Sequence, residues 1–213
     1  MTTQGSEDWH AERLGKVTAS RIADVMMNPT TAGYQNYRAQ LVCERLTQTP
    51  TKAFTSAAMQ HGTDTEPRAR AMYELETGLE VREVGFVPHP TLEMTGASPD
   101  GLVDSPSNPH MDDNGLVEIK CPQPAKHIKN LTGANIDRNY MLQMQWQMVC
   151  TERSWCDFVS FCPSLPPEMQ IFIQRVQMDL SLCQDIEEAV QDFLKGVDAV
   201  TAELTEKYQK EAA

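Results

Sequence analysis

The segment Leu116-Val117-Glu118-Ile119-Lys120 carries two charged residues in an otherwise apolar run. Alternate side chains of a β-strand point to the same face, so Glu118 and Lys120 are expected to project together. Val117 and Ile119 are expected to face the opposite side. Burying charge is costly unless the charges are paired or bind a metal ion. The pattern therefore indicates a polar site on one face of a strand.

A second carboxylate is expected beside this strand. The segment from Ser105 to Gly115 is rich in Pro, Asn and Asp and ends in Asn-Gly, which is a strong turn signal. A hairpin closed by this loop lays Asp100 alongside Glu118. Oxygen ligands of this kind favour a hard divalent cation, which can activate water and neutralise charge on a phosphate. Lys120 is placed to assist the attacking water or to stabilise the developing phosphate charge.

The same residues also fit a surface hairpin with an exposed ion pair, because P-D…E-x-K is a short pattern. Two features favour a site. Both parts of the pattern fall on predicted adjacent strands, and a predicted upstream helix supplies a further carboxylate, Glu66. Asp100, Glu118, Lys120 and Glu66 are therefore candidate active-site residues.

The composition limits what the protein can be. With 213 residues, of which 40% are apolar and 23% charged, the chain is expected to fold as a single domain over residues 1–213. Its net charge of −12 argues against attraction of the whole molecule to nucleic acid, but leaves room for a local basic groove. The sequence has neither a secretory signal nor the roughly 20 apolar residues of a membrane span. We therefore expect a cytoplasmic protein without membrane contact, whose six cysteines are free thiols.

Hydrophobic periodicity and turn signals predict a mixed α/β fold, with a central sheet flanked by helices. The predicted helices cover residues 21–27, 36–47, 62–78, 141–150 and 181 to the end. The predicted strands cover residues 80–87, 94–103, 116–121, 155–162 and 169–178. The candidate carboxylates then come from the sheet, apart from Glu66, which lies on a helix.

Five sequence blocks resemble, in the same order, those of a known family. Asp100, Glu118 and Lys120 are similar to the PD-(D/E)XK nuclease signature, and the wider pattern resembles the phage λ exonuclease (YqaJ-type viral recombinase) family. The resemblance covers most of the chain and implies a restriction-endonuclease-like α/β core. The blocks are Trp9-His10-Ala11-Glu12-Arg13-Leu14-Gly15-Lys16-Val17-Thr18-Ala19-Ser20, Gly62-Thr63-Asp64-Thr65-Glu66-Pro67-Arg68-Ala69-Arg70, Ser98-Pro99-Asp100-Gly101-Leu102, Glu118-Ile119-Lys120-Cys121-Pro122 and Tyr140-Met141-Leu142-Gln143-Met144-Gln145.

The resemblance implies an active site with two Mg²⁺ ions, for which Mn²⁺ is an alternative. Asp100, Glu118 and the main-chain carbonyl of Ile119 would bind the first ion, and Asp100 would help to bridge to the second. Glu66 would orient the attacking water or hold the second ion through water.

The resemblance also assigns two catalytic roles outside the metal ligands. Lys120 would position the nucleophile. Gln143 would hydrogen-bond near Lys120 or the attacking water, and an amide suits this place because it donates and accepts without adding charge.

The resemblance further implies contacts to DNA. Arg13 and Ser20 would form a pocket for the 5′-phosphate of the recessed strand, since arginine offers a bidentate fork and Ser20 opens a predicted helix. Met59 would wedge apart the terminal base pairs, and Lys126 and Lys129 would contact phosphates. Other candidate phosphate contacts are Lys16, Arg21, Lys52, Arg68, Arg70 and Arg138.

The implied activity is a processive 5′→3′ exonuclease that digests linear double-stranded DNA, releases 5′-mononucleotides and leaves a 3′ single-stranded overhang for recombination. The implied assembly is a homotrimeric ring. The implied partner is a single-strand annealing protein, both proteins being encoded by a phage or prophage in a bacterial host. Two alternatives stay open: a PD-(D/E)XK endonuclease with the same metal site, and a non-catalytic protein that binds DNA ends.

Overall fold

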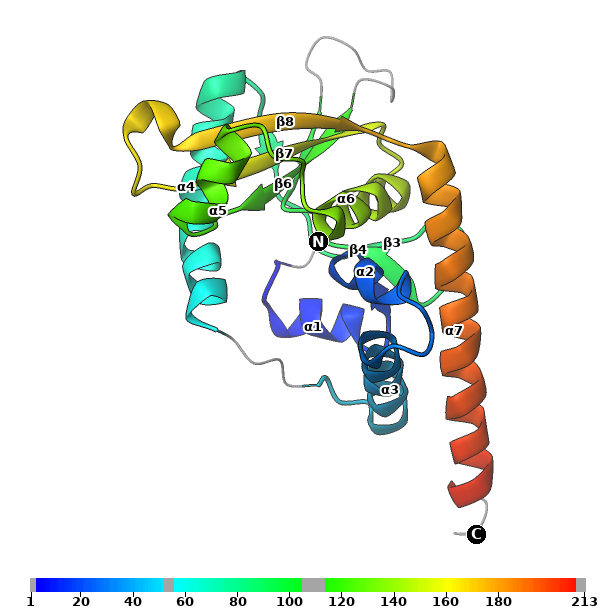
Figure 1. Cartoon of the computed structure of the whole chain (residues 1–213). Helices are drawn as coiled ribbons and strands as arrows, with labels where there is room; N and C mark the ends of the chain where they lie inside the picture. Colours follow the sequence, from blue (N-terminus) through cyan, green and yellow to red (C-terminus); the bar gives the residue numbers. More distant parts are fainter. Residues whose placement is uncertain (1–2, 52–55, 105–113, 210–213) are drawn as a thin grey trace.

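A five-stranded mixed sheet forms the centre of the computed structural model, which describes residues 3–51, 56–104 and 114–209 (Figure 1). Its strand order is β2-β5-β6-β7-β8, with a parallel β6–β7 pair and antiparallel neighbours elsewhere. A smaller three-stranded sheet has the order β1-β4-β3. The strands are β1 (Val17–Thr18), β2 (Val81–Arg82), β3 (Val87–Pro88), β4 (Thr95–Ala97), β5 (Gly101–Val103), β6 (Gly115–Lys120), β7 (Trp155–Phe161) and β8 (Ile171–Gln177).

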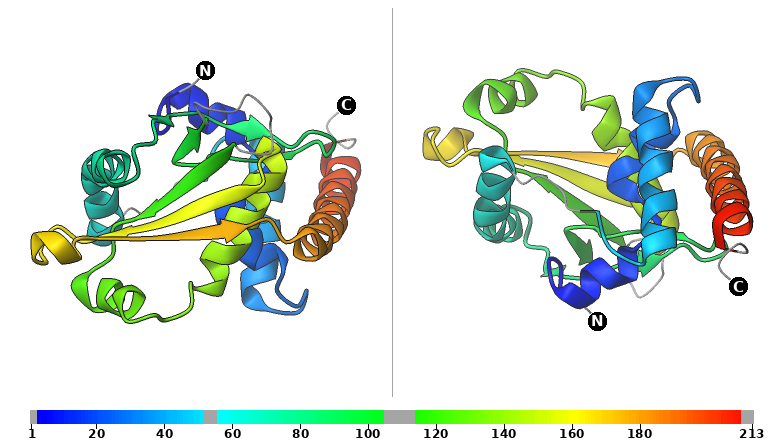
Figure 2. Two further views of the ribbon diagram at one scale, coloured as in Figure 1. Left: turned by 90° about the horizontal axis from the view of Figure 1, so that it is seen from above. Right: turned by 90° about the horizontal axis from the view of Figure 1, so that it is seen from below.

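Helices flank this sheet, as the sequence predicts for a mixed α/β fold. Figure 2 shows α4 on one side of the central sheet and α5 on the other, and α7 runs down the side of the molecule opposite α4 (Figure 1). The helices are α1 (Glu7–Arg13), η1 (Ala19–Arg21), α2 (Ile22–Val25), α3 (Ala32–Thr47), α4 (Ala57–Thr77), α5 (Pro124–Leu131), α6 (Arg138–Thr151), η3 (Pro167–Met169) and α7 (Leu180–Gln209).

The two faces of β6 pack against different helices. Val117 and Ile119 belong to the apolar cluster under α4, together with Tyr73. Leu116 belongs to the cluster on the other face, where it packs with Met148 of α6. The alternation predicted for this strand is therefore confirmed, and it directs Glu118 and Lys120 toward α6.

A third apolar cluster lies between α2, α3, α6 and α7. Trp146, Tyr37 and Phe193 are fully or almost fully buried in it, and the rings of Tyr37 and Phe193 stack with centroids 5.3 Å apart. This cluster fixes α6 between the sheet and the helical part of the molecule. The side chains of α6 that face the sheet are consequently held in a rigid layer.

Several predicted elements differ from those observed. The predicted strand over residues 94–103 is two strands in two sheets, because Pro99 cannot donate a ladder hydrogen bond and the chain turns there. The predicted strand over 80–87 is likewise divided between the sheets. The predicted helix over 21–27 is shorter, and Ser20 lies inside η1 rather than at a helix start. The structure also contains two helices that the sequence analysis does not predict, α1 and α5. The predicted Ser105–Gly115 turn lies largely outside the described residues.

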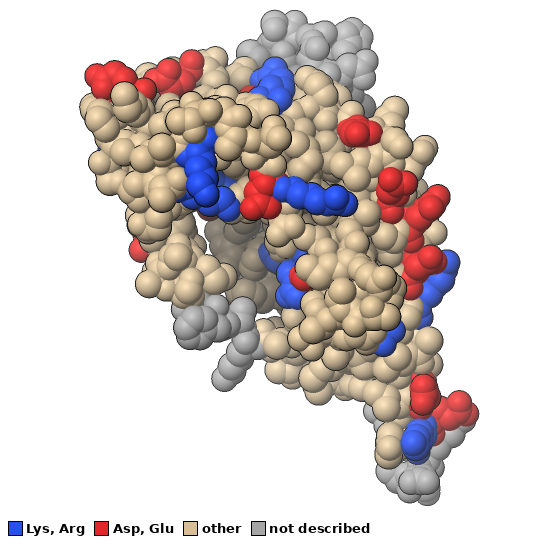
Figure 3. Space-filling model, viewed as in Figure 1, with Lys and Arg blue, Asp and Glu red and all other residues tan. Residues whose placement is uncertain are grey.

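The six cysteines are free, as expected from the sequence. In the part of the chain that the structure describes, every helix is too short or too polar to cross a membrane. On the face shown in Figure 3, acidic side chains gather along the edge formed by α7, whereas Lys and Arg side chains stand around a hollow beside α4. The negative net charge is thus unevenly distributed over this face.

A buried histidine links the segment after β3 to α7. His89 Nδ1 accepts hydrogen bonds from the amides of Thr91 (3.2 Å) and Leu92 (2.9 Å), and its ring stacks on Trp146. Its Nε2 lies 3.3 Å from Oε1 of Glu187 on α7. Burial lowers the pKa of His89, although Glu187 works in the opposite direction. The neutral ring with Nδ1 unprotonated therefore fits this site.

We predict that acidification destabilises the protein through His89. In the unfolded chain His89 takes up a proton near its ordinary pKa, whereas in the folded protein it does so only at lower pH. The contribution of His89 to stability is therefore complete above the ordinary pKa of the unfolded state. The contribution is lost as the pH falls from there through the lowered folded pKa. Urea unfolding of His89→Gln should therefore show a flatter pH dependence than wild type. The exposed His10→Gln is the control, and an unchanged slope in His89→Gln would contradict the prediction.

Candidate active site

The carboxylate of Glu118 is fully buried and is held from three directions. Its Oε1 accepts a hydrogen bond from Nε2 of Gln143 (2.7 Å) and forms an ion pair with Lys120 Nζ. Its Oε2 accepts a hydrogen bond from Nε2 of Gln147 (2.6 Å). Strand β6 and helix α6 thus fix this side chain together.

Asp100 lies directly beside Glu118, as the hairpin prediction requires. The β5–β6 register pairs Gly101 with Val117, so Asp100 stands one position before the start of β5, opposite Glu118. There its Oδ2 accepts a hydrogen bond from the amide of Ile119 at 2.7 Å, in place of a ladder bond. The carbonyl of a strand residue leaves the chain on the same edge as its amide, so the Ile119 carbonyl also faces this edge.

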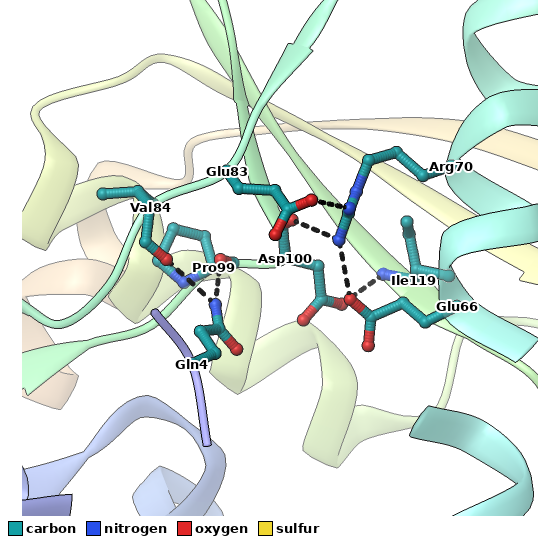
Figure 4. A network of polar contacts seen from close by, with 8 residues as sticks. All are labelled: Gln4, Glu66, Arg70, Glu83, Val84, Pro99, Asp100 and Ile119. Atoms are coloured by element: carbon teal, nitrogen blue, oxygen red, sulfur yellow. Dashed lines mark hydrogen bonds and ion pairs between the residues drawn. The ribbon is translucent and has the colours of Figure 1, made fainter. Parts of the chain in front are cut away.

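A second network joins α4 to the same strands (Figure 4). Arg70 Nη2 donates to Oε1 of Glu66 (2.9 Å) and to the main-chain oxygen of Asp100 (3.4 Å), and Arg70 Nη1 pairs with Glu83. Glu66 is therefore brought to the site and turned toward Arg70. Arg70 itself is largely buried and is paired with both carboxylates, so in this structure its guanidinium holds Glu66.

The electrostatics of the cluster favour a cation. Burial raises the pKa of Asp100 well above its usual range, and repulsion from Glu118 and Glu66 adds to this. Burial also raises the pKa of Glu66, although Arg70 opposes the shift. Burial works against the charged form of Lys120, but Glu118 and Asp100 outweigh it and raise its pKa. The protein alone therefore leaves its carboxylates incompletely neutralised.

A charge count of the network agrees with this conclusion. Four carboxylates meet two cationic side chains, so two negative charges lack a partner within the network. Its members are Glu66, Glu83, Asp100, Glu118, Arg70 and Lys120. A bound divalent cation would offset this excess of carboxylates.

The donor set determines which residues fit such an ion. Across residues 3–51, 56–104 and 114–209, no three His, Cys, Asp or Glu side chains are grouped so that they could hold a metal ion. A site built on two carboxylates, Asp100 and Glu118, with the Ile119 carbonyl as a third oxygen, does not need such a group. These oxygen donors fit Mg²⁺ or Mn²⁺ with water in the remaining positions.

Several of the candidate side chains border an open pocket of about 430 Å³. Glu66, Asp100 and Lys120 line it together with Tyr140 and Met59. Met59 lies in the first turn of α4 and is 56% exposed, which suits a side chain that contacts a ligand. A pocket of this size accommodates a nucleotide.

Two of the candidate phosphate contacts lie together on α5. Lys126 and Lys129 are both exposed on α5, which places them on one helix, and Lys126 Nζ lies 3.0 Å from the hydroxyl of Tyr140 at the pocket wall. Neither lysine is among the residues that line the pocket. Lys52 lies outside the described residues.

The structure brings Arg13 and Ser20 to the same neighbourhood around Tyr37. The Arg13 guanidinium lies over the Trp9 ring, with its central carbon 3.8 Å from the ring centroid. Burial lowers the pKa of Arg13 to about 10, while Tyr37 and Glu44 oppose this shift. The Tyr37 hydroxyl accepts the amide hydrogen of Thr18, whose side chain lies 3.4 Å from the exposed Ser20 hydroxyl.

Two side chains of the N-terminal segment contact the turn that carries Asp100. Trp9 Nε1 donates to the hydroxyl of Ser98 (3.0 Å), two residues before Asp100. Gln4 Nε2 donates to the carbonyls of Val84 (3.1 Å) and Pro99 (2.8 Å), as Figure 4 shows. The N-terminal segment therefore helps to hold the turn that carries Asp100.

Sequence reasoning missed several residues of the site. One residue of a quoted motif lies outside the site: Gln145 points away from it and donates to the carbonyl of Gln177. Sequence reasoning gave no role to Gln147, although helical periodicity places Gln147 on the same face as Gln143. For Glu83 and Gln4 the sequence holds no comparable signal, because their contacts depend on the tertiary fold.

Residues 8–154 match the family model described as the YqaJ-like viral recombinase domain. This match covers more than half of the chain, and the chain therefore belongs to the YqaJ-like viral recombinase family. The fold and the order of the site residues agree with the family resemblance of the sequence blocks.

Solved structures extend the comparison. An alkaline exonuclease from Laribacter hongkongensis, LHK-Exo, is 48% identical with a TM-score of 0.88, covering 96% of this chain and 99% of that chain. A second structure of that enzyme, in complex with dAMP, gives the same values. A phage related exonuclease from Haemophilus somnus 129PT has a TM-score of 0.66 at 16% identity, covering 89% of this chain and 96% of that one. This last likeness concerns the fold alone.

A curated viral relative is also similar. "Uncharacterized protein R354" of Acanthamoeba polyphaga mimivirus is 28% identical over 171 residues, which is 73% of this chain. The chain spans only 28% of the length of that protein.

Proposed function

We propose that the protein is a Mg²⁺-dependent 5′→3′ exonuclease that acts processively on linear double-stranded DNA, releases 5′-mononucleotides and leaves a 3′ single-stranded overhang. The observation that carries the proposal is the convergence of Asp100, Glu118 and Lys120: Lys120 pairs with the buried Glu118, and both Asp100 and Lys120 line one pocket. The 48% identity to an alkaline exonuclease over nearly the whole chain supports the same activity. The dAMP bound by that enzyme belongs to the proposed class of product.

The residues of the site have separable roles in this reaction. Asp100, Glu118 and the Ile119 carbonyl would hold a divalent cation, and Glu66 would assist a second one. Such ions supply Lewis-acid activation of water and neutralise phosphate charge. The Lys120 ammonium, fixed by its ion pair with Glu118, donates hydrogen bonds to the attacking water or to a phosphate oxygen.

The chemistry of the cut accounts for a pocket that binds 5′-phosphate. Water attacks the phosphorus atom and the bond to the 3′ oxygen of the terminal nucleotide breaks, so a 5′-mononucleotide leaves with a 3′-hydroxyl. The shortened strand then carries a new 5′-phosphate. Arg13 and Ser20 would bind this group, so each cut regenerates the end that the pocket recognises.

The proposed assembly and partner rest on family membership. We propose a homotrimeric ring that encloses the duplex, and a single-strand annealing protein that coats the 3′ overhang, encoded by a phage or prophage in a bacterial cytoplasm. Enclosure would supply processivity without sequence-specific contacts. Exposed Lys126 and Lys129 support contact of this chain with the phosphate backbone.

The direct test incubates the purified protein and Mg²⁺ with one DNA sequence in two forms, a linear duplex with 5′-phosphates and a closed circle. We expect digestion of the linear form alone, with mononucleotides and single-stranded DNA as products. Cleavage of the circle would favour the endonuclease alternative. Binding of ends without cleavage, unaffected by EDTA, would favour the non-catalytic one.

A further inference from the structure

Helix α6 presents three glutamines at alternate positions, and they divide between its two sides. Gln143 and Gln147 are one helical turn apart and both donate to Glu118. Gln145 faces away, where it donates to Gln177 and its Oε1 accepts the amide hydrogen of Asp179 (2.8 Å). Gln145 and Gln147 are both buried on one helix, but only Gln147 contacts Glu118.

We infer that Gln147 is a positioning residue for the metal-binding carboxylate: by holding Oε2 of Glu118 it fixes the plane in which that carboxylate meets a divalent cation. The inference rests on the proposed function. It concerns a residue that touches Glu118 rather than substrate or metal.

The two carboxylate oxygens of Glu118 have different partners. Gln143 and Lys120 both contact Oε1 of Glu118, whereas Gln147 holds Oε2 at 2.6 Å. A carboxylate held at one oxygen can still rotate about its last torsion, but one held at both oxygens cannot. Orientation of a ligating carboxylate by its hydrogen-bond partners is what tunes metal affinity.

The environment of Gln147 supports orientation rather than simple packing. Its side chain is fully buried, and its Oε1 has no hydrogen-bond partner within the described residues. Turning the amide over would place this oxygen against the Glu118 carboxylate, so Nε2 must face Glu118. A neutral donor also leaves the full charge of Glu118 for the cation.

The test compares Gln147→Met with Gln145→Met, because methionine keeps the length of the side chain and removes the amide. Mn²⁺ affinity is measured by electron paramagnetic resonance without DNA, and thermal melting reports folding. We expect Gln147→Met to weaken Mn²⁺ binding about 10- to 100-fold. It should raise the Mg²⁺ concentration for half-maximal digestion by a similar factor, with kcat at saturating Mg²⁺ changed much less. Gln145→Met should melt earlier but bind Mn²⁺ as wild type does.

The outcomes separate this inference from the proposed function. Wild-type Mn²⁺ affinity in a folded Gln147→Met would overturn the inference and leave the proposed function intact. Equal weakening in Gln145→Met would also overturn it, because a general loss of packing would then suffice. Absence of both Mn²⁺ binding and digestion in the wild type would overturn the proposed function and the inference with it. If Gln147→Met fails to fold, Gln147→Leu gives the same comparison.

Discussion

Asp100→Asn should reduce DNA hydrolysis at least about 1,000-fold while the metal-free protein becomes more stable. The amide keeps an acceptor for the Ile119 amide, so the turn is retained. It removes a charge that would bind a cation. It also removes the cost of holding that charge in a buried site beside Glu118 and Glu66, where the pKa of Asp100 is raised.

Two measurements check this prediction. Digestion of 5′-phosphorylated duplex in Mg²⁺ gives the activity, and thermal melting in EDTA gives the stability. Lys120→Met should lower the rate about 100- to 1,000-fold, since it removes one charged donor from the reacting phosphate. Asp192→Asn on the exposed face of α7 should change neither quantity. Metal-dependent turnover in Asp100→Asn comparable to wild type would exclude the assigned active site.

Arg13→Ala should lower the rate on 5′-phosphorylated ends about 10- to 100-fold and affect 5′-hydroxyl ends much less. A hydrogen bond to a charged group contributes about 1.5–3 kcal/mol, which corresponds to this range. Because burial lowers the pKa of Arg13 only to about 10, the guanidinium stays charged at neutral pH. It is therefore available to bind the phosphate that each cut creates.

The ratio of the rates on the two kinds of end is the informative quantity, because it cancels any general loss of protein quality. Arg38→Ala on α3 serves as the control for removing an arginine, and its ratio should equal that of wild type. Equal losses on both ends in Arg13→Ala would show that Arg13 supports the fold around Trp9 rather than a phosphate pocket.

A chain of contacts links the sites of these two predictions. Trp9 lies under Arg13 and donates to Ser98, which begins the turn that carries Asp100. A change at Arg13 can therefore disturb the turn as well as the pocket. Measuring the 5′-hydroxyl rate in Arg13→Ala separates the two effects, because only disturbance of the turn lowers that rate.

Much of the catalytic strand could be predicted from the sequence alone. The period of two in β6 sets which side chains share a face, and it correctly placed Glu118 and Lys120 opposite Val117 and Ile119. The hairpin pairing that brings Asp100 to Glu118 also follows from local signals. These features depend on residues close in the chain, whose geometry the backbone fixes.

The tertiary structure decided the rest, because it depends on residues far apart in the chain. Packing between distant segments divides residues 94–103 between two sheets. It also pairs Arg70 with Glu66 and Glu83. The hydrogen bonds from Gln4 to the carbonyls of Val84 and Pro99 have the same origin. No local periodicity specifies which distant partner a buried charge finds. The sequence therefore determined which residues could do the chemistry, and the fold determined which of them hold one another in place.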